Sequence, residues 1–329
     1  MLDKLIPQGE KLSNQYIIVI ENRNLLQALC GPNDLNLTAI QKTMDIKVFT
    51  RGNELILDSY EINIQNKFKK LVDKLIEHFN IGHIPDPQLI YTLYNSISTK
   101  GDNETDLLKK YHIPIPKSPK VFPRNHNQAL YIEGMYNKDI IFAVGPAGTG
   151  KTYLAIAHAL KEILEKKKRK LILTRPVVEA GESLGFLPGD LNQKISPYLR
   201  PLYDAIDSLI PFNIIKQLED NRVIEIAPLA YMRGRSLKDS YILLDEAQNT
   251  TKEQMKMFLT RLGEGSKAII TGDITQIDLP LRKKSGLVHS LEILKDLKDI
   301  HFSFFNAQDI VRSPLVKAIV NAYERNEKE

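Results

Sequence analysis

The chain has 329 residues, of which 43% are hydrophobic, so it is long and apolar enough to bury a core and to form two domains. A net charge of +5 is mildly basic, which permits a nucleic-acid partner without requiring one. The apolar runs are too short to cross a bilayer and residues 1–4 lack an export signal, so we expect a cytoplasmic protein with no membrane partner.

Residues 1–82 are predicted to form a small α/β module. We expect strands at 16–20, 46–50 and 55–57, and helices at 24–30, 35–44 and 68–79. The order βααββα, with a glycine-containing loop between the first two helices, resembles a KH RNA-binding domain. Here the loop is Gly31-Pro32-Asn33-Asp34, which lacks the second glycine of a GXXG loop. RNA binding and a docking or oligomerisation role therefore both stay open.

Residues 83–126 are predicted to be a partly helical, proline-rich linker. The segment contains Pro114, Pro116, Pro119 and Pro123. Prolines at this density favour extended backbone, so we expect a semi-rigid connector, with the domain boundary near residue 112.

Residues 127–329 are predicted to form a second α/β domain. Strands are expected at 140–144, 171–174, 223–226, 241–244, 268–271 and 300–304. Helical runs separate most of them, which favours a largely parallel sheet with helices on both faces. Ligands of such folds bind at the carboxyl ends of the strands, and the polar motifs of this chain follow its strands there.

The motif G-x-x-x-x-G-K-T follows the first of these strands. It consists of Gly145, Pro146, Ala147, Gly148, Thr149, Gly150, Lys151 and Thr152. An apolar strand before it and a helix-compatible run after it distinguish it from a chance match in a loop. Its N–H groups would wrap a phosphate chain, Lys151 would reach the β- and γ-phosphates, and the Thr152 hydroxyl would hold Mg²⁺. Because no N-K-x-D sequence for guanine is present, we expect ATP rather than GTP.

Two acids, Asp245 and Glu246, follow the predicted strand at 241–244. An ATPase needs one acid to position Mg²⁺ and another to orient the attacking water, and we assign these roles to Asp245 and Glu246 respectively. Acids also occur commonly at helix N-termini, which is the alternative without catalysis. The presence of a P-loop in the same chain favours the catalytic interpretation.

A second strand, predicted at 268–271, ends in Gly272 and Asp273, with Gln276 shortly after. The Gln276 amide can donate and accept hydrogen bonds at once, so it is suited to sense the γ-phosphate or the attacking water. Asp273 could link this sensor to the metal site. A turn after a buried strand also uses Gly-Asp, so a purely structural role stays open.

Further candidates for binding are one glutamine and several arginines. Gln128 lies seventeen residues before Gly145, and its amide could pair with the edge of adenine. The arginines in loops or at a strand end are Arg175, Arg233, Arg235 and Arg312. Any of them could bind a nucleic-acid phosphate and one could be an arginine finger, although loop arginines are usually just solvated.

The chain resembles the PhoH-like ATPase family over residues 112–325, and its N-terminal module also fits the bacterial members. The motifs that carry the resemblance are GPAGTGKT, LTRPVVEAGESLGFLPGDL, PYLRPLYDA, IEIAPLAYMRGRSL, LLDEAQNTTKEQMKMFLTRLGEGSKAIITGDITQIDLP and DIVRSPLVKAIVNAYE. This family is similar to the core domain of superfamily 1 helicases, which implies a RecA-like P-loop NTPase fold. It also implies binding and hydrolysis of ATP with Mg²⁺ and an adenine-reading role for Gln128.

The resemblance further implies a role in RNA metabolism or ribosome assembly, with RNA or a ribosome-associated protein as partner and RNA helicase activity as one option. The alternative is a nucleotide-gated assembly factor or scaffold with slow turnover and no unwinding. A small-molecule kinase is a third option, although the acid pair at a strand end suits activation of water better.

Helicases of superfamily 1 bind ATP between two core domains, whereas this chain has one. We therefore expect a neighbouring subunit to complete the site in a ring-like homo-oligomer, for which a hexamer is one option. Arg312 or Arg235 would then act across the subunit interface.

Overall fold

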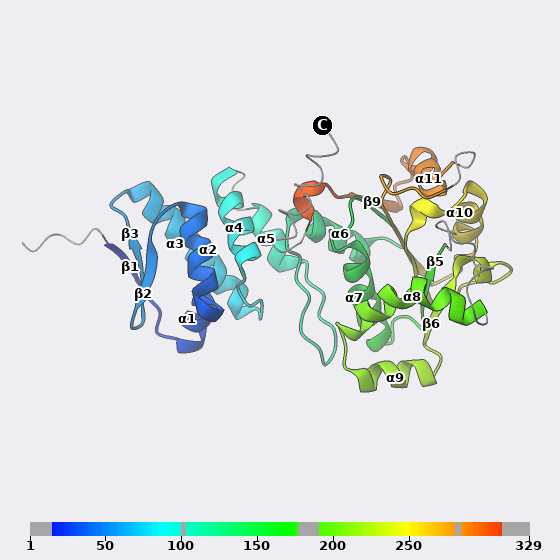
Figure 1. Cartoon of the computed structure of the whole chain (residues 1–329), viewed down its shortest axis with the longest axis horizontal. Coiled ribbons are helices and arrows are strands. Elements are labelled where there is room, and N and C mark those ends of the chain that lie inside the picture. The colour runs from blue at the N-terminus through cyan, green and yellow to red at the C-terminus, as the bar shows by residue number, and fades with distance from the viewer. Residues whose placement is uncertain (1–14, 100–102, 177–190, 280–283, 311–329) are drawn as a thin grey trace, which may run out of the picture. The chain divides into compact units, whose positions relative to one another are not determined.

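The computed structural model describes residues 15–99, 103–176, 191–279 and 284–310 (Figure 1). The chain divides into two compact units between Lys110 and Tyr111. This division falls within the segment predicted as a linker and close to the expected boundary at residue 112. Within the described part of the chain, no helix has the length and apolar character needed to span a membrane.

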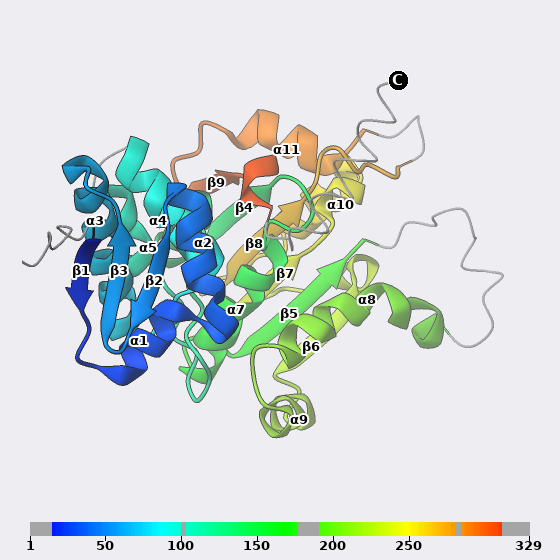
Figure 2. The same cartoon turned by 60° about the vertical axis from the view of Figure 1, so that its left-hand side comes forward.

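The first unit contains a three-stranded antiparallel sheet in the order β1-β3-β2, formed by β1 (Gln15–Val19), β2 (Val48–Arg51) and β3 (Glu54–Asp58). Its first helices are α1 (Arg23–Cys30), α2 (Leu35–Met44) and α3 (Ile62–Asn80). The predicted order βααββα is confirmed (Figure 2). Tyr16 of β1 meets the ring of Phe68 of α3 edge-on at 6.4 Å, so the core lies between sheet and helices.

The loop Gly31–Asp34 connects α1 to α2, where the sequence predicted it. Pro32 to Asp34 form a single 3₁₀ turn, in which Asn33 (φ 50°) and Asp34 (φ 55°) both adopt left-handed backbone conformations. Among residues other than glycine, Asn and Asp tolerate this conformation best. The exposed carboxylate of Asp34 thus stands where a GXXG loop has its second glycine.

Two further helices, α4 (Pro87–Thr99) and α5 (Asn103–Lys110), also belong to the first unit. Helix α4 packs on α2 and α3, and buried Asn36 of α2 donates to the carbonyl of Pro85 at 3.0 Å. These helices lie within the segment predicted to be partly helical, and they belong to the first compact unit.

The proline-rich segment that follows belongs to the second unit. Ile113 and Val121 exchange main-chain hydrogen bonds of 2.8 and 2.9 Å, which fold the segment back on itself. Ile113 and Ile115 are buried in the same cluster as Tyr131 and Met135. The prolines thus stiffen a loop that is attached to the core of this unit.

The second unit is built on a six-stranded parallel sheet in the order β6-β5-β7-β8-β4-β9 (Figure 2). Its strands are β4 (Ile140–Val144), β5 (Lys170–Arg175), β6 (Ile224–Pro228), β7 (Ser240–Leu244), β8 (Lys267–Gly272) and β9 (Ile300–Phe304). All six lie within two residues of their predicted bounds. The predicted α/β fold with a P-loop core is confirmed.

Helices cover both faces of this sheet, so its strands are apolar on both sides. They are α6 (His126–Asn137), α7 (Lys151–Leu164), α8 (Leu191–Asp207), α9 (Phe212–Asp220), α10 (Lys252–Leu259) and α11 (Gly286–Leu294). Within β4, Ile141 belongs to one buried cluster, with residues of α6, α7 and α8, and Phe142 to the other, with residues of α10 and α11. This alternation explains why the strands read as continuous apolar runs.

Helix α10 begins with a capping box. The cap is Thr251, whose hydroxyl accepts from Gln254 N–H, while the Gln254 side chain accepts from Thr251 N–H at 2.9 Å. The preceding residue, Thr250, donates its hydroxyl to the Ala247 carbonyl at 2.7 Å.

Candidate functional site

The G-x-x-x-x-G-K-T motif forms the loop between β4 and α7, at the carboxyl end of the central strands. Gly145 has φ 151°, and a Cβ placed there would lie 2.4 Å from the carbonyl oxygen of Phe305. Gly150 has φ 82°, in the left-handed region, and a Cβ there would meet Gln128 Nε2 at 3.0 Å. Both glycines are therefore required by close approach as well as by backbone conformation.

Lys151 is buried beneath this loop. Its Nζ donates to the carbonyls of Gly145 and Pro146, each at 2.7 Å. Burial lowers the pKa of Lys151, while the carboxylates of Asp273, Asp245 and Glu246 act in the opposite direction. The ammonium group thus lies inside the loop, at the point where the oxygens of a bound phosphate chain would replace the two carbonyls.

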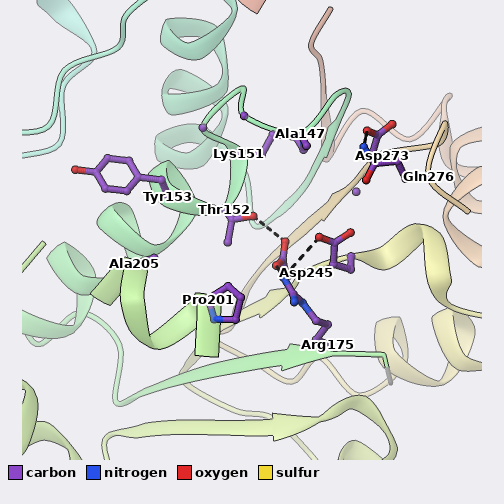
Figure 3. Close-up of a pocket in the computed structure, with 14 residues that line it drawn as sticks. Ala147, Lys151, Thr152, Tyr153, Arg175, Pro201, Ala205, Asp245, Asp273 and Gln276 are labelled. Carbon is purple, nitrogen blue, oxygen red and sulfur yellow. Dashed lines mark hydrogen bonds and ion pairs between the residues drawn. The ribbon is translucent and has the colours of Figure 1, made fainter. Parts of the chain in front are cut away.

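Two oxygens suited to a hard divalent cation meet beside the loop. Thr152 Oγ1, in the first turn of α7, donates to Asp245 Oδ1 at 2.7 Å, and Asp245 directly follows β7 (Figure 3). Thr271 Oγ1, in β8, donates to the same carboxylate oxygen at 2.6 Å. A hydroxyl and a carboxylate fit Mg²⁺, which usually keeps several waters and takes few protein ligands.

Arg175, the last residue of β5, extends toward this carboxylate (Figure 3). Its Nη2 lies 2.6 Å from Asp245 Oδ2 and 3.6 Å from Glu246 Oε1. Its Nη1 donates to the carbonyl of Tyr198 in α8 at 2.9 Å. The sequence suggested a phosphate contact or an arginine finger for Arg175, whereas the structure places it against the candidate metal ligand.

Glu246 is joined to the predicted sensor residues by a chain of hydrogen bonds. Gln248 Nε2 donates to Glu246 Oε2 at 2.6 Å, and Gln248 Oε1 accepts from the N–H of Asp273 at 3.0 Å. Gln276 Nε2 then donates to Asp273 Oδ2 at 3.0 Å. Glu246 itself has φ 52°, an uncommon conformation for glutamate of the kind found at functional sites.

These groups line one cavity of about 310 Å³ at the carboxyl end of the sheet. Helix α8 contributes Pro201 and Ala205 to its wall, and the first turn of α7 contributes Tyr153, whose ring points away from Asp245 (Figure 3). The remaining lining residues are Ala147, Gly148, Gly150, Lys151, Thr152, Arg175, Asp245, Glu246, Gly272, Asp273 and Gln276. The structure thus brings the predicted P-loop, acid pair and sensor into one site.

Gln128 lies behind the P-loop. Its Nε2 donates to the carbonyl of Thr149 at 2.9 Å, and its Oε1 accepts from the N–H of Arg124 at 2.8 Å. The side chain is buried and anchors the loop to α6. Each end of the amide keeps one further bonding position, and its adenine-reading role stays a prediction.

Of the two arginines expected to act across a subunit interface, Arg235 lies among the described residues. Arg235 forms a two-pronged ion pair with Glu225 of β6, with Nη2 at 2.9 Å from Oε2. Hydrogen bonding within the pair lowers the pKa of Glu225 and raises that of Arg235. Arg312 lies outside the described residues, and its role stays a prediction.

Sequence reasoning missed Thr271, Gln248 and the contact of Arg175 with Asp245. The strand pairing explains two of these. Leu244 pairs with Ile270 on one side and with Thr174 on the other, so the residues that follow them, Thr271 and Arg175, flank Asp245. Pairing of this kind can be used only once the order of the strands is known.

The sequence of this chain is similar to several known proteins. A family described as "PhoH-like protein" matches residues 120–324. A PhoH-like protein of Bacillus subtilis is 42% identical over 330 residues, covering 99% of each chain. A PhoH-like protein of Mycobacterium bovis is 44% identical over 306 residues, 93% of this chain and 86% of that protein. Protein PhoH of Escherichia coli is 43% identical over 205 residues, 62% of this chain and 58% of that protein.

Proposed function

Because the chain belongs to the PhoH-like protein family, we propose that it binds ATP with Mg²⁺ and hydrolyses it in the cavity at the carboxyl end of its parallel sheet. The observation that carries the proposal is the hydrogen bond of 2.7 Å between Thr152 and Asp245. It joins a P-loop hydroxyl to a strand-end carboxylate, which is the ligand pair that P-loop NTPases use for Mg²⁺.

Each residue of the site has a role in the proposed reaction. The P-loop N–H groups and Lys151 bind the phosphates, and Thr152 and Asp245 hold Mg²⁺, which neutralises charge on the phosphates. Glu246 orients the attacking water and accepts its proton, and its exposure on the cavity side allows a water to reach it. Gln276 lies on the same cavity and contacts the γ-phosphate or the water.

Two further groups, an amide behind the P-loop and an arginine of a second copy of the chain, complete the proposed site. We assign adenine reading to the free bonding positions of Gln128, beside the P-loop residue Thr149. A second copy of the chain completes the site in a ring, with Arg312 as the arginine in trans. Arg235 is the weaker candidate because its guanidinium is already paired with Glu225.

RNA is the proposed partner of the ATPase cycle, in RNA metabolism or ribosome assembly, with duplex unwinding as one outcome. One observation favours the alternative, a nucleotide-gated assembly factor without unwinding. In the first unit, the exposed Asp34 carboxylate lies in the loop that would have to approach an RNA backbone, and it would repel phosphates.

ATP turnover by the purified chain, with and without single-stranded RNA, tests the proposal. Lys151→Ala should abolish nucleotide binding, whereas Glu246→Gln should bind ATP but not turn it over. Turnover that RNA stimulates supports a remodelling ATPase and makes unwinding of a tailed duplex the next assay. Turnover indifferent to RNA favours the assembly factor, and wild-type protein without turnover contradicts the ATPase.

A further inference from the structure

We propose that Arg175 is a positioning residue that competes with Mg²⁺ for the Asp245 carboxylate, and that Mg²⁺ must displace it when nucleotide binds. This exchange would signal the state of the site to helix α8 through Tyr198. The inference rests on the proposed function, since it requires a nucleotide and Mg²⁺ to bind at this site.

The Asp245 carboxylate is buried and both of its oxygens already have partners. Asp245 is 4% exposed, and its Oδ1 accepts from both Thr152 and Thr271. Its Oδ2 is held by Arg175 at 2.6 Å, and across the described segments this is the one ion pair of Asp245. A buried carboxylate is costly without a cation, so Arg175 supplies the positive charge that a bound Mg²⁺ would otherwise supply.

The Arg175 guanidinium and a bound Mg²⁺ would repel each other at the Asp245 carboxylate, so they cannot both bind it tightly. A divalent ion held between Thr152 and Asp245 would lie within a few ångström of the guanidinium. Because the Arg175 and Asp245 side chains are only 17% and 5% exposed, solvent would screen the repulsion weakly. Arg175 is also imperfectly held, because its buried Nε has no hydrogen-bond partner. The contact of Arg175 with Asp245 is therefore the one that gives way.

Arg175 also contacts helix α8 and Glu246, so its release from Asp245 would affect both. Arg175 Nη1 donates to the Tyr198 carbonyl at 2.9 Å, and Glu246 Oε1 lies 3.6 Å from Nη2. Tyr198 belongs to α8, which also supplies Pro201 and Ala205 to the cavity wall (Figure 3). One side chain thus connects the metal ligand to a helix of the wall, so a change at Asp245 reaches α8 through a direct contact.

If Arg175 has only a structural role, its removal should change Mg²⁺ binding in the opposite direction. If the guanidinium only holds Asp245 in the geometry that Mg²⁺ needs, its removal would weaken metal binding. If it competes with Mg²⁺, its removal would strengthen metal binding. The direction of the change in Mg²⁺ requirement therefore separates the two roles.

The experiment titrates Mg²⁺ at a fixed concentration of a fluorescent, slowly hydrolysed ATP analogue and measures its binding to the full-length chain. Arg175→Gln should lower the half-saturating Mg²⁺ concentration about ten-fold, which corresponds to about 1.4 kcal/mol of relieved repulsion. Arg175→Lys keeps the charge and should keep a Mg²⁺ requirement close to that of the wild type. Arg200→Gln, at an exposed position of α8, is the matched control and should leave it unchanged.

Amide hydrogen exchange of residues 199–207 tests the connection to α8. In the wild type, Mg²⁺ and nucleotide together should change the exchange of α8, whereas in Arg175→Gln and Arg175→Lys, which lack the two-pronged bridge, the change should be lost. Thermal melting of each variant without nucleotide checks that it is folded. An unchanged or raised Mg²⁺ requirement in Arg175→Gln overturns the inference alone, whereas wild-type protein that binds no nucleotide with Mg²⁺ overturns the proposed function as well.

Discussion

Gln248 connects Glu246 to Asp273, donating to the first at 2.6 Å and accepting the main-chain N–H of the second at 3.0 Å. The amide is 1% exposed, so it cannot exchange these partners for water without a local rearrangement. It therefore fixes the direction of the carboxylate that we assign to water activation. Because Glu246 has a left-handed backbone conformation, this bond also helps to hold the residue in an unfavourable geometry.

We expect Gln248→Leu to lower the kcat for ATP hydrolysis roughly 10- to 100-fold, because the base is no longer oriented, while ATP affinity changes little. Steady-state turnover and equilibrium nucleotide binding measure the two effects separately. Gln217→Leu, at an exposed position of α9, serves as the control and should retain wild-type turnover. An equal loss of binding and turnover would show that Gln248 supports the P-loop rather than the base.

Gly145 is predicted to tolerate no side chain. A Cβ would approach the Phe305 carbonyl oxygen to 2.4 Å, so Gly145→Ala should displace the P-loop, abolish nucleotide binding and lower the free energy of unfolding by roughly 1–3 kcal/mol. Urea unfolding and nucleotide binding check the prediction. Gly234→Ala is the matched control, since Gly234 also has positive φ (78°) but a Cβ there meets nothing within 4 Å. Equal effects of the two substitutions would contradict the steric argument.

Much of this fold is encoded locally and could be predicted from the sequence. The strand at 140–144 is a continuous apolar run, and its bounds agree with the structure because burial on both faces leaves no polar position within it. The P-loop is a local motif whose glycines are needed for its own backbone. The acids at 245 and 246 follow their strand directly, so they lie at the same edge of the sheet.

The contacts between strands could not be predicted in this way. Arg175 meets Asp245 only because β5 lies beside β7, seventy residues later in the chain, and the periodicity of a sequence does not contain the order of strands. The same applies to α4, whose packing on α2 and α3 depends on long-range contacts. Proline density predicted a semi-rigid connector within residues 83–126, but it gave no sign that Ile113 and Ile115 are buried in the core of the second unit.

Gln128 should stabilise the P-loop even without nucleotide. Its Nε2 satisfies the carbonyl of Thr149, so Gln128→Leu should lower the free energy of unfolding by about 1–2 kcal/mol and raise the Kd for ATP. Urea unfolding of wild type and variant without ligand measures the anchoring role. Equilibrium binding of ATP and of GTP measures the base-reading role. A loss of preference for ATP over GTP would support adenine reading in addition. Unchanged stability of the ligand-free variant would contradict the anchoring role.

His78 makes the stability of the first unit sensitive to acid. It is fully buried in α3, with Nδ1 at 2.9 Å from Nδ1 of His83, and burial lowers its pKa to about 3, with smaller contributions from His83, Lys109 and Lys74. Above pH 6.5 the ring is neutral in the folded and unfolded chains alike. Below it, the unfolded chain binds a proton that the folded chain does not, so stability falls as the pH decreases toward 3.

The expected loss is about 1.4 kcal/mol per pH unit below 6.5, or about 2 kcal/mol at pH 5. Urea unfolding of the full chain at pH 7 and pH 5, followed by circular dichroism, measures it. His78→Leu has no titrating group at this position, so its stability should change between the two pH values by about 2 kcal/mol less than that of the wild type. His289→Gln, in α11 of the second unit, should behave as the wild type does. If His78→Leu and wild type lose equal stability on acidification, the buried ring is not the source of the acid sensitivity.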